Sequence, residues 1–125
     1  MLGGNYNNHH GAGSKTSVRV APGEEANSLL IGVNPDLLAG NGSLYKVSPL
    51  KSGAKPLLIG SIPNQPAEPV AWTHSYGDKQ ARVFYTSLGH PDDFTNTSFR
   101  RLLLNGILWA TGQPIPPADA PLARP

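Results

Sequence analysis

Residues 82–112 contain the pattern that most constrains how this chain can fold. An apolar run of β-forming residues at 83–85 predicts a buried strand. After a polar turn, one of residues 95–97 can cap a helix, and Gly112 with Pro114 can end it. Between these ends, apolar residues recur at the spacing of one helix face, namely Phe99, Leu102, Leu103, Gly106, Ile107 and Ala110. The stretch therefore predicts a strand, a turn and a long, largely buried helix.

The turn between these two elements, residues 87–93, contains the strongest candidate for a functional site. It joins the carboxyl end of a strand to the start of a helix, which is the edge where open α/β sheets bind ligands. His90, Asp92 and Asp93 place an imidazole and two carboxylates there. The alternative is a structural turn, in which an aspartate caps backbone amides and His90 is solvated.

The composition predicts one small, loop-rich domain. The chain has 125 residues, 38% of them hydrophobic and 14% charged, with 14 glycines and 13 prolines. The formal net charge is +2, and the basic residues are scattered, so no nucleic-acid partner is expected. The absence of cysteine excludes disulfides, thiolate zinc sites and a cysteine nucleophile.

The sequence contains no apolar run of about 20 residues, so no membrane-spanning helix is expected. The first residues lack the basic and apolar regions of a signal peptide. The compartment is unknown from the sequence, with the cytoplasm as the default expectation.

A stretch rich in glycine and asparagine, residues 1–14, predicts a loop that contains His9 and His10. Neighbouring side chains on an extended backbone point to opposite faces, so this pair alone makes a poor chelate. A metal site would need more ligands, and the other histidines are His74 and His90. We therefore expect neither a metal nor a cofactor.

Short apolar runs between the loop and residue 82 predict further elements. Strands are expected at residues 16–21, 44–47, 56–62 and 70–75, with helical turns within residues 26–33 and at Leu37 and Leu38. Residues 77–80 are expected to form a hairpin connection. Four or five strands before a single helix would leave a sheet with an open face, as in the second half of a larger α/β domain.

Residues 113–125 are rich in proline and predict an extended, flexible tail after a domain at residues 1–112. Within the domain, Trp72 and Trp109 lie in apolar patterns and are expected to pack in the core. Arg100 and Arg101 are expected to form a solvated shoulder of the helix.

Three segments together are similar to a known family. They are PVAWTHSYG at residues 69–77, RVFYTSLGH at residues 82–90 and FRRLLLNGILWA at residues 99–110. In these segments the chain resembles the ThuA-like domains of the trehalose-utilisation family, and LGGNYNNHHG, SLLIGV and SLYKVSPL extend the resemblance upstream. It implies an α/β, flavodoxin-like fold related to class I glutamine amidotransferases, and by this resemblance the chain lacks the N-terminal half of that fold.

The resemblance also implies roles for individual residues. His90-Pro91-Asp92 is similar to the His-Pro-Glu of the amidotransferases, in which histidine is the base for a cysteine nucleophile. His90 and Asp92 are then the implied catalytic pair, with the carboxylate orienting the imidazole. The implied substrate-binding residues are His9, His10, Tyr76 and Asp93. Because the chain has no cysteine, it is not expected to be a cysteine-dependent glutaminase.

The family is linked to disaccharide and keto-sugar metabolism, so the resemblance implies a hydrolase-like domain that acts on a sugar-like small molecule. Two alternatives stay open. One is a non-catalytic module that binds a small molecule or a protein in the same crevice. The other is an inactive, truncated half-domain, whose exposed sheet face would favour self-association.

Overall fold

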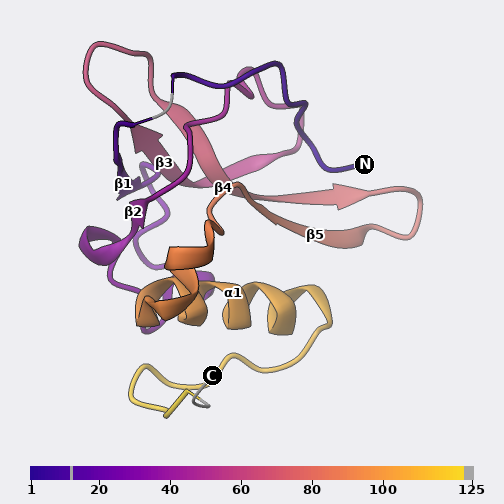
Figure 1. Cartoon of the computed structure of the whole chain (residues 1–125). Helices are drawn as coiled ribbons and strands as arrows, with labels where there is room; N and C mark the ends of the chain where they lie inside the picture. The colour runs from indigo at the N-terminus through magenta and orange to yellow at the C-terminus, as the bar shows by residue number, and fades with distance from the viewer. Residues whose placement is uncertain (12, 123–125) are drawn as a thin grey trace.

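The computed structural model describes residues 1–11 and 13–122. Its strands form one five-stranded sheet in the order β2-β1-β3-β4-β5, and a single long helix lies against the β4–β5 side (Figure 1). The strands are β1 Thr16–Val20, β2 Ala39–Gly40, β3 Lys55–Ser61, β4 Glu68–Tyr76 and β5 Ala81–Thr86. The helices are α1 Thr97–Ala110 and the short 3₁₀ helices η1 Ser28–Leu30, η2 Pro35–Leu37 and η3 Pro91–Thr95. None of the described helices is long and apolar enough to cross a membrane.

Every strand pairing in the described sheet is antiparallel. The mixed strand and helix composition is as expected, but the parallel sheet of a flavodoxin-like fold is not found among these strands. The connections explain the difference. Residues 62–67 and 77–80 link β3 to β4 and β4 to β5, and both links are shorter than the dozen or so residues that a parallel crossover needs.

The apolar runs identify three of the strands correctly, since β1, β3 and β4 lie where residues 16–21, 56–62 and 70–75 predict them. Residues 77–80 form the expected hairpin, in which Tyr76 pairs with Ala81. The predicted strand at residues 44–47 is wrong. There the backbone pairs with the N-terminal loop instead, through an isolated bridge between His9 and Tyr45.

Helix α1 begins and ends as the sequence predicts. The Asn96 side chain caps it by accepting hydrogen bonds from the amides of Ser98 and Phe99. At the other end, Gly112 adopts φ 73° and its N–H donates to the Trp109 carbonyl. The next N–H donates to the Leu108 carbonyl, which completes a Schellman motif.

The buried face of α1 lies directly on the sheet. Phe99 and Leu102 are 2% and 0% exposed and belong to the same core as Leu58 and Ala71 of β3 and β4. Gly106 lies so close to β5 that a Cβ atom there would overlap the ring of Phe84. A glycine at this position therefore lets the helix approach the sheet, at a cost in helix propensity.

Arg101 is buried, with 2% of its surface exposed, so the expectation that it is solvated is wrong. Its guanidinium donates to the Asn105 side chain at 3.1 Å and to the carbonyls of Pro116, Pro117 and Ala120 in the tail. These carbonyls replace the water that the cation loses on burial. The tail thus folds back along α1 as far as residue 122, and residues 123–125 lie outside the described part. The division of the chain at residue 112 stays a prediction.

Asn105 is fully buried and extends this network to the η1 segment. Its amide nitrogen donates to the carbonyls of Leu29 and Ile31, both at 2.9 Å. Because the same side chain accepts from Arg101, it links the η1 segment, the helix and the tail. A buried polar network in which the members find partners fixes the relative positions of its segments.

The opposite face of the sheet is covered by the N-terminal segment. Trp72 is 1% exposed, as expected of a core residue, and its indole N–H donates to the Leu2 carbonyl at 2.7 Å. The indole also stacks on Tyr85, with ring centroids 3.8 Å apart. Trp109 is half-buried at the end of α1, where the Arg82 guanidinium lies 5.4 Å from its ring centroid.

Gly106→Ala should destabilise the fold, because the added methyl group forces Phe84 or the helix to move. Overpacking costs about 1–3 kcal/mol, and the better helix propensity of alanine offsets at most about 1 kcal/mol. We expect a net loss of about 1–2 kcal/mol in the free energy of unfolding, measured by urea titration. Gly11→Ala is the control, because a Cβ there meets no atom within 4 Å. Equal stability of both variants would contradict the close helix–sheet contact.

Burial raises the pKa of the Tyr85 phenol, and the neighbouring Tyr45 phenol acts in the same direction. The folded chain then holds this proton more tightly than the unfolded chain, so the stability it contributes is complete below the ordinary tyrosine pKa of about 10 and is lost above it. We expect the free energy of unfolding to fall as the pH rises above about 9, and to fall less in Tyr85→Phe. Identical pH profiles for the two proteins, measured by urea titration, would exclude this contribution.

Candidate functional site

His90 lies at the start of η3, in the turn that connects β5 to α1. Pro91 occupies the first position of η3, where its missing N–H costs no hydrogen bond. The imidazole Nδ1 accepts a hydrogen bond from the Asp92 N–H at 3.3 Å and lies 3.5 Å from Asp92 Oδ2. The side chain is 41% exposed, so a solute can reach it. The turn therefore combines a local helix cap with an accessible imidazole.

The two contacts of Nδ1 require different positions of the ring proton. When Nδ1 accepts from the Asp92 amide, a neutral imidazole carries its proton on Nε2. When Nδ1 instead donates to the Asp92 carboxylate, the role of Nε2 depends on the form of the ring. In the neutral imidazole Nε2 carries a lone pair and accepts, and in the imidazolium it carries a proton and donates. Both contacts within the described part use Nδ1, so Nε2 can face a ligand.

Asp93, and not Asp92, is the carboxylate that organises the turn. It is 4% exposed, whereas the Asp92 side chain is 77% exposed. Asp93 Oδ2 accepts from the amides of Gly89 and His90, both at 2.9 Å, and Oδ1 accepts from the Asn41 side chain at 2.6 Å. Asp93 thus fixes the backbone of His90 and ties the turn to the loop that follows β2.

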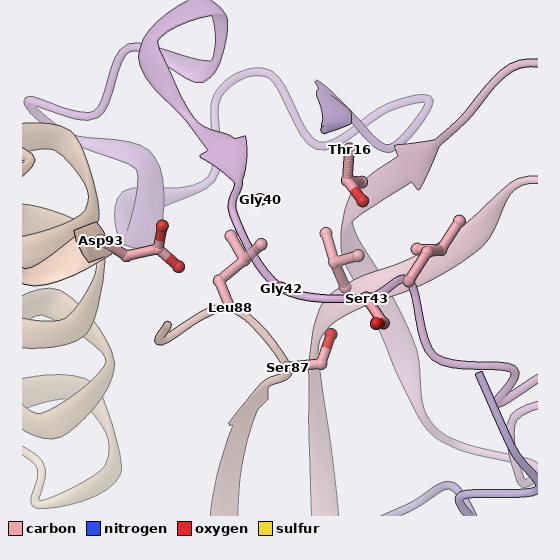
Figure 2. A pocket seen from close by; sticks show the side chains of 9 residues that line it. Thr16, Gly40, Gly42, Ser43, Ser87, Leu88 and Asp93 are labelled. Carbon is pink, nitrogen blue, oxygen red and sulfur yellow. The ribbon is translucent and has the colours of Figure 1, made fainter. Parts of the chain in front are cut away.

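A small cleft lies beside the turn (Figure 2). The volume open to the centre of a water molecule is about 10 Å³, which is room for a single water-sized group. Four polar side chains line the cleft, those of Thr16, Ser43, Ser87 and Asp93. The rest of the lining is apolar or glycine, namely Leu44, Val70, Leu88, Gly40 and Gly42. The polar residues come from β1, the loop after β2, the end of β5 and η3.

The sequence identifies only one of these polar residues, Asp93, as a site residue. Thr16 begins β1 and Ser87 directly follows β5, whereas Ser43 lies in the loop after β2. A position at a strand end is the available signal for Thr16 and Ser87, but only the sheet order brings the three residues together. Asn41 is missed for the same reason, because its contact with Asp93 joins residues far apart in the sequence.

The histidines of the N-terminal loop lie at different depths. His10 is 7% exposed, and its amide donates at 2.8 Å to the carbonyl of Leu44, which lines the cleft. His10 Nε2 is buried without a hydrogen-bond partner in the described part. His9 is exposed, with its Nδ1 at 2.7 Å from the His10 carbonyl oxygen. The loop thus lies beside the cleft, and the substrate-binding role of these histidines stays a prediction.

Tyr76 lies at the other end of β4, next to the hairpin at residues 77–80. The cleft is near Val70 and Ser87, where β4 begins and β5 has ended. The structure therefore separates Tyr76 from His90. Among residues 1–11 and 13–122, no group of three or more histidines and carboxylates lies close enough together to hold a metal ion.

Asp93→Asn should destabilise the turn, because an amide NH₂ replaces one of the acceptors that face three N–H donors. Loss of hydrogen bonds to a buried charge costs about 2–3 kcal/mol in the free energy of unfolding. Asp92→Asn is the matched control, with an expected change within about 0.5 kcal/mol for this exposed side chain. Thermal and urea unfolding measure both variants, and equal losses would refute the structural role of Asp93.

The chain matches one family model, ThuA, described as trehalose utilisation, over residues 1–110. Searches of curated proteins and of solved structures each gave no match. The family match includes the cleft, the His90 turn and all of α1. Since it spans most of the chain, the chain belongs to the ThuA family, and the family's description supports a role related to carbohydrate metabolism.

Proposed function

We propose that this chain acts on a disaccharide or keto-sugar in a hydrolase-like reaction, with His90 as the general acid or base. Family membership supports the carbohydrate class. One observation supports the choice of His90: the ring is accessible, and its contacts in the described part use Nδ1, which leaves Nε2 for a ligand. Proton transfer by a positioned imidazole contributes about 10²- to 10⁴-fold to a rate.

In this proposal Asp92 controls which ring nitrogen of His90 carries the proton, and Asp93 positions the backbone of His90. The Asp92 amide holds the tautomer with Nε2–H, in which His90 can donate a hydrogen bond to a sugar oxygen. The Asp92 carboxylate favours the form that carries a proton on Nδ1, which frees the Nε2 lone pair to act as a base. Asp93 fixes the backbone of His90 in both protonation forms of the ring, because it accepts a hydrogen bond from the His90 amide.

The substrate-binding role is proposed for Asp93, His10 and His9, in decreasing order of structural support. Asp93 lines the cleft, His10 lies beside it through Leu44, and His9 is exposed on the same loop. Tyr76 has no such support, because it lies at the far end of β4. A ligand at His90 would therefore contact the cleft side of the turn.

The finer assignment to a flavodoxin-like, amidotransferase-related fold is also a proposal. Its support is the sequence of elements from β5 through η3 to α1, which matches the strand, histidine turn and helix of that fold class. The described strands pair in an antiparallel way, so any parallel part of such a sheet would have to pair with an edge strand, β2 or β5.

His90→Asn separates catalysis from folding. Asparagine is among the best N-cap residues, so the variant should keep η3 and unfold within about 0.5 kcal/mol of the wild type. If His90 transfers a proton, glucose release from trehalose should fall by about 10²-fold or more. The measurement is a coupled assay for glucose, with trehalose as the test substrate.

The control for this experiment is Lys79→Asn, which changes an exposed side chain in the β4–β5 hairpin, at the opposite end of these strands from the cleft. It should keep at least half of the wild-type rate. Wild-type turnover by His90→Asn would exclude the acid–base role and leave only binding at this turn.

One observation favours a second function, self-association. β5 is an edge strand that pairs with β4 alone in the described sheet. A groove of about 340 Å³ lies between β5 and α1, lined by Phe84, Leu103, Ile107 and other apolar residues. Ile107 is 55% exposed there. Unpaired strand edges beside exposed apolar surface favour pairing with another chain.

If the β5 edge mediates self-association, Ile107→Glu should shift the chain toward monomer in sedimentation velocity at high concentration. A charge at this position opposes burial of the groove in an interface. Leu37→Glu is the matched control, since Leu37 is also 55% exposed but lies on η2, away from β5. A wild-type chain that sediments as a monomer at every concentration would exclude this function.

A further inference from the structure

The Thr16 hydroxyl is buried and has no hydrogen-bond partner in the described part of the chain. Thr16 is 2% exposed, at the first position of β1. Leaving a buried hydroxyl without a partner is costly, so such a group in a folded protein indicates a missing acceptor or donor. Figure 2 shows the Thr16 oxygen pointing toward the side of the cleft where Ser43 and Ser87 lie.

Two glycines determine which way Thr16 points. A Cβ atom on Gly60 would lie 2.7 Å from the Thr16 methyl carbon, and a Cβ atom on Gly40 would lie 3.0 Å from Thr16 Cβ. The absence of side chains at these positions makes space for Thr16 between β2 and β3. With its methyl group packed at Gly60, the hydroxyl is left facing the cleft.

The lining of the cleft selects the kind of group that it can hold. Thr16, Ser43 and Ser87 each offer a hydroxyl that donates and accepts, whereas Asp93 offers only acceptors. The Asp93 carboxylate disfavours an anion, and a calcium or magnesium ion needs six or more oxygen ligands in a larger space. A hydroxyl, which donates to Asp93 and accepts from a neighbour, fits both the chemistry and the volume of about 10 Å³.

We propose that this cleft is a hydroxyl-binding subsite. In it, Thr16 Oγ1 forms a hydrogen bond either with one hydroxyl group of a polyhydroxy ligand or, when no ligand is bound, with a water molecule. The ligand part of the inference rests on the proposed carbohydrate function. The cleft and the His90 turn share Leu88 and Asp93. A sugar anchored by one hydroxyl in the cleft is therefore held next to the turn that contains His90.

The first arm of the test uses no sugar. Thr16→Val keeps the shape of the side chain and removes only the hydroxyl. If the hydroxyl binds water in the cleft, the variant loses this bond, and its thermal midpoint should fall by about 3–6 °C. A midpoint equal to or above that of the wild type would show that the hydroxyl has no partner, because removing an unsatisfied buried group stabilises a fold. That result would overturn the subsite and leave the role of His90 untouched.

The second arm measures trehalose binding by isothermal titration calorimetry. Thr16→Val should weaken the affinity about three- to tenfold, the effect of one hydrogen bond. Thr16→Ser, which keeps the hydroxyl, should bind within about twofold of the wild type. Unchanged affinity in Thr16→Val would mean that the cleft holds water alone, which overturns the ligand part of the proposal.

Failure of the proposed function has a separate signature. His90→Asn should lose turnover, but adding Thr16→Val to it should still weaken trehalose binding about three- to tenfold, because the hydroxyl anchor does not depend on the imidazole. Wild-type turnover in His90→Asn, together with weaker trehalose binding in Thr16→Val, would retain the subsite and reject the acid–base role. A wild-type chain that does not bind trehalose would overturn the ligand part of the inference.

Discussion

The buried carboxylate of Asp93 is the interaction on which the geometry of the site depends. It accepts hydrogen bonds from two successive backbone amides and from the Asn41 side chain. These donors compensate for the loss of water around the charge. Because one donor comes from the loop after β2, Asp93 joins the start of the helical region to the sheet edge. The position of His90 follows from this contact, since its own amide is one of the donors.

The network around Arg101 holds the segment that follows α1, just as Asp93 holds the turn that precedes it. A buried guanidinium is usually paired with a carboxylate, but here its described partners are carbonyls of the tail and the amide oxygen of Asn105. Several neutral oxygens can satisfy the N–H groups of the cation without an ion pair. The segment after α1 is thereby part of the packed structure as far as residue 122, although its composition is typical of a linker.

Features that depend on neighbouring residues could be predicted from the sequence. The helix face, the Asn96 cap and the Gly112 stop need only a few consecutive positions, and so does the β4–β5 hairpin. Strand direction could not be predicted in the same way, because the resemblance describes a whole flavodoxin-like domain while the short links within this chain require antiparallel pairing. The burial of Arg101 was missed because its partners lie in a proline-rich segment that offers no side-chain signal.

The same distinction between local features and contacts between distant segments applies to the site. His90 and its carboxylate neighbours form one short motif, so the sequence identifies the turn. The structural role of Asp93 depends in part on Asn41, and the cleft depends on the pairing of β1 with β2 and β3. Thr16 has no chemical motif of its own, and it becomes notable only when two glycines leave its hydroxyl buried.

The position of Trp72 has a spectroscopic consequence. Its indole is enclosed, bonded to the Leu2 carbonyl and stacked on a phenol, whereas Trp109 is partly open to solvent. Fluorescence from the chain should therefore contain a blue component from the first indole and a redder one from the second. Detachment of the amino-terminal segment from the sheet would redden only the first component, so light emission can follow that local event while the helix stays folded.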